Sequence, residues 1–365
     1  MRKIISFVGF LLILLTLFRI PAAQAASGLP DSPQFGYGAR IKLTAPPSAE
    51  AVQALARQFN IAAQTGLDWI ALDFDWAQHA PTQAGVNLAP FDALMALATQ
   101  NDLNVLVSIT HAPGWSLGPS GPDLAATANL ILTLARQYPG TLQAIECFPA
   151  ANTAQGWGAP PDPNAYAQLL NSAHAALEAN QMGVILIAAG LTPLSAASGA
   201  TDIEDTVFLA GLYQAGVREN MPVISLRLPN LSGDPLSPIH NDGSTQLRHF
   251  ESIRQVMLAN GHDRGLLWIT AFAWPAAYTE PQTQATWLVQ AYELLQSHLY
   301  MGAAFFDSFN PVQNGAALIA ANGAYHPGLT SLNKLIASRR STPPQQITAR
   351  KKMILRTDFK SPGRR

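Results

Sequence analysis

Short apolar runs alternate with amphipathic stretches from about residue 35 to residue 338 of the 365-residue chain. Short apolar runs predict buried strands, and apolar residues spaced three and four apart predict helices. Eight strands are predicted, at Gly36–Ile41, Trp69–Phe74, Asn104–Ile109, Leu142–Phe148, Val184–Ala188, Val223–Leu228, Leu266–Ala271 and Ala303–Asp307. Eight helices are predicted, near residues 49–65, 91–100, 122–137, 164–180, 205–216, 246–260, 282–298 and 328–338.

This regular alternation is typical of βα units, which build parallel sheets. Eight units over roughly 310 residues predict a single (β/α)8 TIM barrel, a fold that needs about 250 residues plus insertions. We assign the barrel to residues 26–338. A doubly wound open sheet is the alternative fold, and it is disfavoured because no Gly-rich phosphate loop follows any predicted strand.

The first 25 residues have the pattern of a secretory signal peptide. Arg2 and Lys3 precede an apolar run from Ile4 to Phe18, and Ala23-Gln24-Ala25 supplies small residues at the cleavage spacing. The alternative is an uncleaved membrane anchor, but the run is shorter than the roughly 20 residues that span a bilayer. The protein is therefore expected to be secreted or held at the cell surface.

Composition and charge indicate which classes of binding partner the protein can have. Apolar residues make up 48% of the chain and charged residues 12%, which favours a well-packed core. Residues 26–338 carry 10 Lys and Arg against 22 Asp and Glu, and so acidic a body argues against nucleic acid as a partner. Residues 339–365 carry 9 Lys and Arg against one Asp, and predict a disordered basic tail. The tail either contacts an anionic surface polymer or lipid head group, or is a solvated end without a specific role.

Two segments carry the main functional information. Residues 146–152 read Glu-Cys-Phe-Pro-Ala-Ala-Asn, and they begin within the fourth predicted strand and continue past its end. Residues 268–275 read Trp-Ile-Thr-Ala-Phe-Ala-Trp-Pro and end the seventh. Active sites of TIM barrels lie at the C-terminal ends of the strands, so both segments are expected at the same face of the barrel.

These segments resemble the active-site strands of the retaining (β/α)8 glycoside hydrolases of clan A, which include cellulases and xylosidases. In that clan the first strand typically reads Glu-Ile-Trp-Asn-Glu-Pro-Asn, and its second Glu is the acid/base. The later strand typically reads Ile-Thr-Glu-Phe-Gly-Trp, and its Glu is the nucleophile. The resemblance places Ala150 at the acid/base position and Ala271 at the nucleophile position.

Neighbouring positions depart from the clan pattern as well. Pro149 stands where the clan usually has the Asn that holds the sugar 2-hydroxyl, and Phe148 and Ala273 replace its Trp and Gly. Retaining hydrolysis needs two carboxyl groups roughly 5–5.5 Å apart, and a methyl group can replace neither. The sequence therefore predicts a glycoside-hydrolase-like barrel that has lost the usual catalytic groups.

Other carboxylates could take over the chemistry. Asp73 and Asp75 share one face of the second strand by its period of two, and Asp307 ends the eighth. An active glycosidase that uses these relocated groups stays open as an alternative. The other interpretation is that one of Asp73 and Asp75 caps the following turn and the other is solvated. Glu146 lies within the fourth strand, where a buried hydrogen-bonding role is expected.

A set of aromatic and polar residues is predicted to form a sugar-binding groove at the barrel mouth. Aromatic rings stack on the C–H faces of sugars, and indole N–H groups form hydrogen bonds. His111 lies in a loop similar to the clan's loop after strand three, and Arg227 corresponds to a clan His at the end of strand six. The predicted groove residues are Trp76, His111, Trp115, Asn152, Trp157, Arg227, Trp274 and Asp307. Simple packing in the core is the alternative for each Trp.

No metal or other cofactor is predicted, because the eight histidines show no paired metal spacing and Cys147 is the only cysteine. Three functions remain open at this point. The first is an exported, non-catalytic barrel that binds an oligosaccharide, a polysaccharide or a protein at the former active-site face. The others are an active glycosidase with relocated carboxylates, and a structural or assembly protein without sugar affinity.

Overall fold

The computed structural model describes residues 35–43, 49–194, 198–239, 245–275, 280–311, 317–320 and 323–340. The predicted signal peptide lies outside these residues, as does the predicted basic tail beyond Arg340. Among the described helices, none combines the length and the apolar character needed to cross a bilayer.

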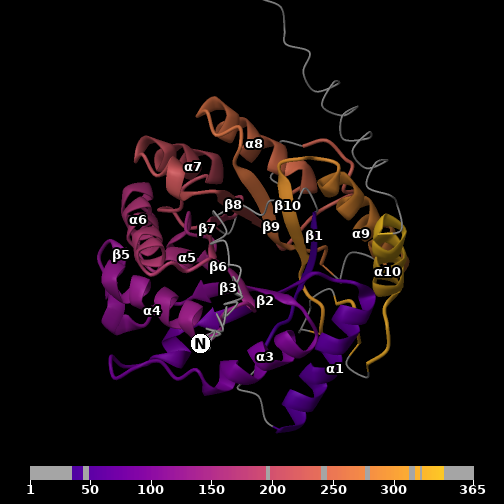
Figure 1. Cartoon of the computed structure of the whole chain (residues 1–365). Coiled ribbons are helices and arrows are strands. Elements are labelled where there is room, and N and C mark those ends of the chain that lie inside the picture. Colours follow the sequence, from indigo (N-terminus) through magenta and orange to yellow (C-terminus); the bar gives the residue numbers. More distant parts are fainter. Residues whose placement is uncertain are drawn as a thin grey trace, which may run out of the picture.

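Within the described residues, eight parallel strands close into a barrel, which confirms the predicted (β/α)8 TIM fold (Figure 1). The strands hydrogen-bond in the order β1-β10-β9-β8-β7-β6-β3-β2 around the ring. Their bounds are β1 (Gly36–Arg40), β2 (Trp69–Asp75), β3 (Asn104–Thr110), β6 (Leu142–Cys147), β7 (Ile185–Leu191), β8 (Val223–Leu228), β9 (Leu266–Phe272) and β10 (Met301–Phe306). All eight overlap the strands that the apolar pattern predicts.

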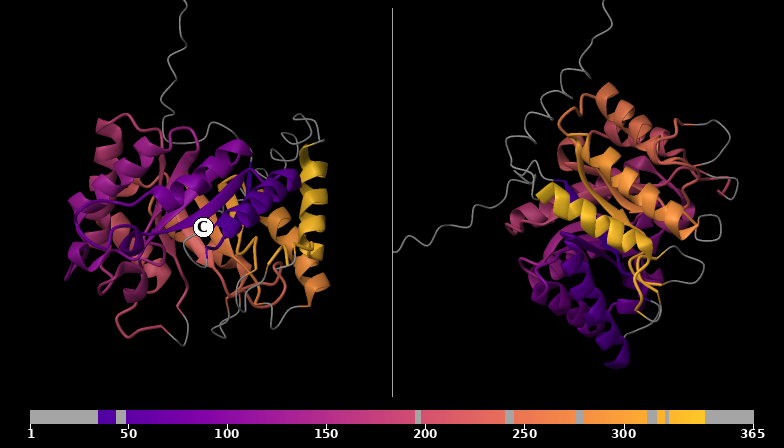
Figure 2. Two further views of the ribbon diagram at one scale, coloured as in Figure 1. Left: turned by 90° about the horizontal axis from the view of Figure 1, so that it is seen from below. Right: turned by 90° about the vertical axis from the view of Figure 1, so that its right-hand side faces the viewer.

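One long helix follows each barrel strand, and these helices form a ring around the barrel (Figure 1). They are α1 (Ala49–Thr65), α3 (Ala89–Gln100), α4 (Leu124–Gln137), α6 (Pro163–Ala179), α7 (Asp205–Gln214), α8 (Phe250–Ala259), α9 (Pro281–Gln296) and α10 (Pro327–Arg340). The last helix, α10, packs against both α9 and α1 and so completes the ring (Figure 2).

Short elements lie in the loops at the C-terminal ends of the strands. They are the helices α2 (Trp76–His79) and α5 (Ala154–Trp157), and the hairpin of β4 (Leu117–Gly118) and β5 (Gly121–Pro122). Single 3-10 turns at Gly114–Ser116 and Leu247–His249 also lie in these loops, and a third, Arg218–Asn220, lies between α7 and β8 at the opposite end of the barrel.

Helix ends follow local chemistry that the sequence already indicates. Asp162 accepts a hydrogen bond from the backbone N–H of Asn164 and caps α6, whose first residue is Pro163 with a suitable φ. Gly66 and Gly261 follow α1 and α8 with φ values of 90° and 69°, which only glycine adopts without strain.

The barrel interior changes from apolar to polar along the strands, because alternate residues of a strand face the same side. An apolar cluster fills the N-terminal part of the interior, formed by Ala71, Leu106, Ala144, Ile187, Val223, Trp268, Ala303 and Phe305. On several strands the inward residue two positions later is polar: Asp73 after Ala71, Ser108 after Leu106, Glu146 after Ala144, Thr270 after Trp268 and Asp307 after Phe305. Polar groups therefore gather at the C-terminal mouth.

Gly38 on β1 makes room for the ring of Phe305, since a Cβ atom built at Gly38 would lie 2.4 Å from that ring. Phe305 is fully buried, so we expect Gly38→Ala to lower the free energy of unfolding by about 1–3 kcal/mol through overpacking. The matched control is Gly183→Ala, where a Cβ would meet nothing within 4 Å. Urea unfolding of both variants tests this: equal stability of the two would show that the barrel interior is loosely packed.

Candidate binding cleft at the barrel mouth

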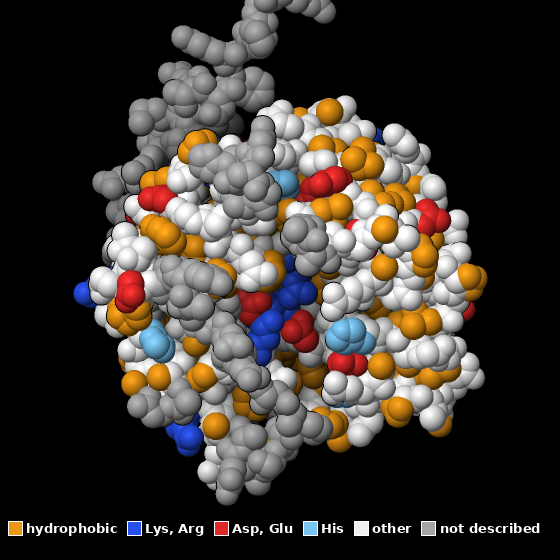
Figure 3. Space-filling model, turned by 180° about the vertical axis from the view of Figure 1, so that it is seen from behind, with side chains coloured by type: hydrophobic (Ala, Val, Ile, Leu, Met, Phe, Trp, Pro, Cys, Tyr) orange, Lys and Arg blue, Asp and Glu red, His pale blue; other side chains and the backbone are white. Residues whose placement is uncertain are grey.

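A cleft of about 780 Å³ opens at the C-terminal ends of the strands. Its walls come from the ends of β1, β2, β3, β6, β7, β8 and β10 and from the short loops and helices after them. Acidic and basic side chains lie side by side in the hollow at the centre of one face of the molecule (Figure 3). The functional face of the fold thus carries a charged cleft.

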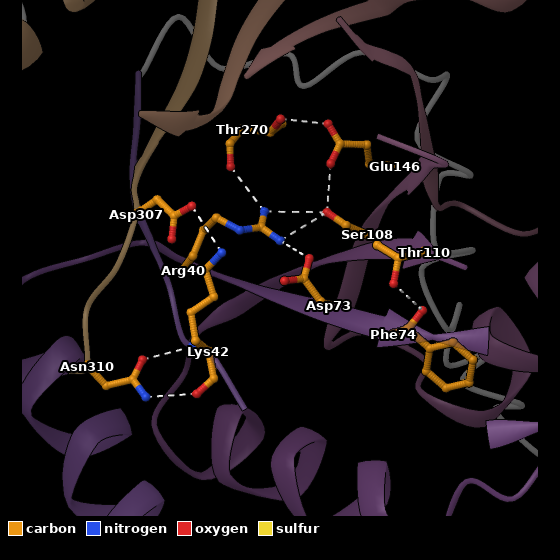
Figure 4. Close-up of polar contacts among 10 residues, drawn as sticks. All are labelled: Arg40, Lys42, Asp73, Phe74, Ser108, Thr110, Glu146, Thr270, Asp307 and Asn310. Carbon is orange, nitrogen blue, oxygen red and sulfur yellow. Dashed lines mark hydrogen bonds and ion pairs between the residues drawn. The ribbon is translucent and has the colours of Figure 1, made fainter. Parts of the chain in front are cut away.

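Arg40 lies at the base of the cleft, with only 1% of its surface exposed. Its guanidinium forms an ion pair with Asp73 and donates a hydrogen bond of 3.1 Å to the carbonyl of Thr270 (Figure 4). Burial disfavours the charge on Arg40, but the carboxylates of Asp73, Asp307 and Glu146 outweigh burial and raise its pKa. Burial likewise opposes ionisation of Asp73, but Arg40, Arg227 and Lys42 hold its pKa below the ordinary value. Asp73 is therefore an ionised partner of Arg40 at neutral pH.

Glu146 is fully buried beside this pair. Ser108 Oγ donates to one carboxyl oxygen of Glu146 at 2.7 Å, and Thr270 Oγ1 donates to the other at 2.6 Å (Figure 4). Ser108 also lies 3.4 Å from Arg40, so the network is continuous. Glu146 thus has the buried, hydrogen-bonding position that the sequence predicts.

A second tier of ion pairs lies nearer the solvent. Lys42 Nζ is 3.1 Å from a carboxyl oxygen of Asp307, and the Asn310 amide binds the backbone of Lys42 through two hydrogen bonds of 2.8 Å (Figure 4). Asp75 caps α2 by accepting from the backbone N–H of Gln78 at 3.0 Å, and its other oxygen is 2.8 Å from His111 Nδ1. All three aspartates that line the cleft therefore have partners.

The two alanines of the clan-like segments occupy comparable places on the fourth and seventh barrel strands. Ala150 follows β6 and lines the cleft. Ala271 lies on β9 directly across from Arg227 of β8, after an irregularity in register that skips Thr270. Paired residues of neighbouring strands face the same side, so Ala271 faces inward with Arg227. Irregularities of this kind redirect side chains and are common beside active sites.

Unfavourable backbone conformations gather around the cleft. His111, Phe148, Ala150 and Ala189 have φ values of 46°, 49°, 62° and 77°, in the left-handed region that non-glycine residues rarely adopt. Two hydrogen bonds join this region, from Ala150 N to Gly190 O at 2.8 Å and from Ala151 N to Ala189 O at 3.2 Å. Such strain costs about 1–3 kcal/mol per residue and clusters at binding and catalytic sites.

The structure brings only part of the predicted groove set together. His111, Arg227 and Asp307 line the cleft. The placement of Trp76, Trp157 and Trp274 at its surface is wrong, since each is only about 1% exposed and none lines the cleft. Trp157 and Trp274 donate to the carbonyls of Ser120 and Gly233, at 3.0 and 2.9 Å, and so each is held against the loop that follows a neighbouring strand.

Trp115 and Asn152 also form hydrogen bonds with the loop backbone and do not contribute to the cleft wall. Trp115 is partly buried, donates to the carbonyl of Ala80 at 2.8 Å, and packs edge-on against Trp76. Asn152 is fully buried and donates to the carbonyls of Thr192 and Ile203 at 2.8 and 2.9 Å. Neither residue lines the cleft.

Sequence reasoning missed Arg40, Lys42, Ser108 and Thr270. The period-two alternation was the available signal: Gly36, Gly38 and Arg40 share the inward face of β1, and Lys42 continues it. A charged residue inside an otherwise buried strand indicates a paired, inward-facing group. Across the described residues, no group of three or more His, Cys, Asp or Glu side chains could hold a metal ion.

No family model and no curated protein sequence matches the chain. Solved structures similar to the chain include glycoside hydrolases of clan A, from families 5, 10 and 39. A family 39 glycoside hydrolase from the gut symbiont Bacteroides cellulosilyticus WH2 has a TM-score of 0.62 at 15% identity, over 84% of this chain and 64% of that one. The chain thus spans less than two thirds of the length of that enzyme.

Two further neighbours cover more of their own length. A GH5_18 variant from Streptomyces cattleya, in complex with Manβ1-4GlcNAc, has a TM-score of 0.62 at 12% identity, over 85% of this chain and 82% of that one. Xylanase 10B from Thermotoga maritima has a TM-score of 0.57 at 14% identity, over 84% and 96%. At these identities the likeness shows the fold, a glycoside-hydrolase-like TIM barrel.

Proposed function

We propose that the protein is an exported, non-catalytic glycoside-hydrolase-like barrel that binds a glycan in the cleft at its C-terminal face. One observation carries the proposal. Ala150 lines the cleft of about 780 Å³ and Ala271 lies buried across from Arg227 of its wall, while each aspartate on the wall is bound to another residue. A binding site has been kept, and groups free to break a glycosidic bond are missing from its described walls.

The pairing of the aspartates supports the absence of hydrolysis. A general acid must be protonated at the working pH, and glycosidases achieve this by raising the pKa of a carboxyl group. Burial alone would raise the pKa of Asp73, but the charges of Arg40, Arg227 and Lys42 lower it below the ordinary value, which keeps Asp73 ionised. Asp307 is paired with Lys42, and Asp75 caps α2 and contacts His111. A relocated catalytic pair would have to give up these contacts.

The dimensions and lining of the cleft support a glycan as the ligand. Small-molecule sites usually enclose about 300–1,000 Å³ and place a few polar groups on a mostly apolar wall. Leu43, Pro90 and Pro229 supply partly or fully exposed apolar surface here. Hydrogen-bonding groups come from Gln78, Asn87, Thr110, His111, Thr153 and Gln155. Since the predicted tryptophans do not line the wall, sugar binding would depend on these hydrogen bonds more than on stacking.

The ends of the chain support export and a surface location. Residues 1–25 have the charge, length and small residues of a signal peptide, and residues 339–365 are strongly basic. We propose that the basic tail holds the exported barrel near an anionic surface polymer or lipid head group.

Thermal stability against a panel of neutral and acidic oligosaccharides tests the binding proposal. A ligand at about 100 times its dissociation constant should stabilise the protein by roughly 2.7 kcal/mol, which raises the melting temperature by several degrees. Thr110→Trp should remove the shift, because Thr110 lies on the cleft wall. The matched control is Gln168→Trp on the exposed side of α6, and this variant should keep the ligand-induced rise in melting temperature. No shift with any sugar, or equal shifts in both variants, would refute glycan binding in the cleft.

A further inference from the structure

Arg227 is a cation of the cleft wall that forms no hydrogen bond or ion pair with another described residue. The other two cations at this place are engaged, Arg40 with Asp73 and Lys42 with Asp307. Arg227 lies on the cleft wall at the end of β8, with its in-register neighbour Ala271 beside it. The five N–H donors of its guanidinium thus lack acceptors within the described protein.

The electrostatic surroundings leave this charge incompletely compensated. Burial disfavours the charged guanidinium of Arg227, and repulsion from Arg40 adds to that effect. Attraction by Glu146, Asp73 and Asp307 offsets only part of the effect of burial and of Arg40, so the pKa of Arg227 is lowered. An anionic group brought by a ligand would supply the missing counter-charge.

The residue across from Arg227 on the neighbouring strand is small and uncharged, and it is buried. In the clan-like reading the position of Ala271 carries a carboxylate, and here it carries a methyl group across from Arg227. A carboxylate matches the planar fork of a guanidinium and binds it through two parallel hydrogen bonds. Asp73 and Asp307 are close enough to act on Arg227 electrostatically, so they would repel a doubly charged anion more strongly than a single carboxylate.

We propose that the ligand is an acidic glycan, and that the carboxylate of a uronic acid residue pairs with Arg227 beside Ala271. This inference rests on the proposed glycan binding and names its ligand class. The ligand's carboxylate occupies the region where a catalytic carboxylate would otherwise lie. Binding of this kind also excludes the usual hydrolytic arrangement, because the anionic group of the ligand replaces the nucleophile.

Titration of the full chain with matched oligosaccharides tests the inference. The probes are tri- and tetrasaccharides of glucuronate, galacturonate and mannuronate, their neutral counterparts, and a sulfated neutral oligosaccharide. A hydrogen-bonded charge pair predicts that Arg227→Gln weakens uronate binding about tenfold to 100-fold. Arg227→Lys keeps the charge without the planar fork, and its affinity for the uronates should lie between those of the wild type and Arg227→Gln. Arg136→Gln changes an exposed arginine on α4 and should bind as the wild type does.

The outcomes separate this inference from the proposed function. Preferential binding of one uronate series, lost in Arg227→Gln and weakened by salt, would support both. Equal binding of the uronate oligosaccharides by the wild type and Arg227→Gln would overturn the role of Arg227 and leave glycan binding standing. Preference for the sulfated probe would overturn the carboxylate assignment. Binding of none of the sugars by a folded wild type would refute the proposed function and this inference with it.

Discussion

Asp73→Ala should lower the free energy of unfolding by about 3 kcal/mol at neutral pH. Arg40 is 1% exposed, and the substitution removes its ion-pair partner while the guanidinium stays buried. Breaking a buried pair by removing one member costs about 3–5 kcal/mol. We expect the lower end, because 35% of the Asp73 side chain is open to the cleft and Asp307 and Glu146 still attract Arg40. Urea unfolding monitored by circular dichroism gives the value.

Two controls separate the ion pair from general damage. Arg40→Met with Asp73→Ala removes both charges and should be more stable than Asp73→Ala alone. Glu293→Ala breaks an exposed pair with Arg339 of 2.9 Å, and should cost less than about 1 kcal/mol. If Asp73→Ala cost no more than Glu293→Ala, Arg40 would not depend on Asp73 for its charge.

The same substitution has a characteristic pH dependence. Burial opposes ionisation of Asp73, but Arg40 and the other two cations lower its folded-state pKa below the ordinary value of about 3.9. A carboxyl group with a lowered folded pKa stabilises the fold above its unfolded pKa, and this contribution is lost as the pH falls through the folded pKa. The stability difference between wild type and Asp73→Ala should therefore be full at pH 7 and shrink below about pH 4.

The second large effect concerns hydrolysis. We expect the wild type to cleave aryl glycosides at least about 10⁴-fold more slowly than a barrel with both carboxylates, since a positioned acid alone contributes 10²–10⁴ and a nucleophile at least as much. Ala150→Glu with Ala271→Glu should not restore the rate. A glutamate at position 271 would lie across from Arg227 and pair with it, and Ala150 has φ 62° directly after Pro149.

Initial rates on aryl β-glucosides, β-xylosides, β-mannosides and β-glucuronides measure this expectation. The single substitutions Ala150→Glu and Ala271→Glu serve as controls, because either carboxylate alone lacks its catalytic partner. Recovery of hydrolysis in the double variant alone would show that the rest of a retaining site has been preserved. Such a result would contradict the view that Arg227 and Pro149 have changed the site.

The barrel could be predicted from the sequence because its determinants are local and repeated. Each apolar run, such as residues 104–109, needs only its own residues to indicate a buried strand, and eight regular repeats then select the closed fold. Pro163 and Gly66 likewise act within one turn of their helices. The neighbours in space, β10 with β1, then follow from closure.

The cleft was less predictable because a loop has no regular repeat from which the direction of its side chains can be predicted. Trp76, Trp157 and Trp274 follow strand ends, as a groove would require, yet their indole rings complete the core beneath the loops. Trp157 packs so tightly against Gly121 that a Cβ there would lie 2.2 Å from its ring. By contrast, Arg40 follows strict alternation within a strand, and its inward direction was predictable in principle.

The most direct test of the central claim, that the cleft holds a glycan without cleaving it, is one experiment on one set of samples. The melting temperature is measured for each oligosaccharide, and the same samples are analysed for cleavage products after prolonged incubation. We predict a sugar-specific rise of several degrees, absent in Thr110→Trp, with the oligosaccharide recovered intact. Release of shorter sugars in proportion to protein concentration, or no rise with any sugar, would contradict the account.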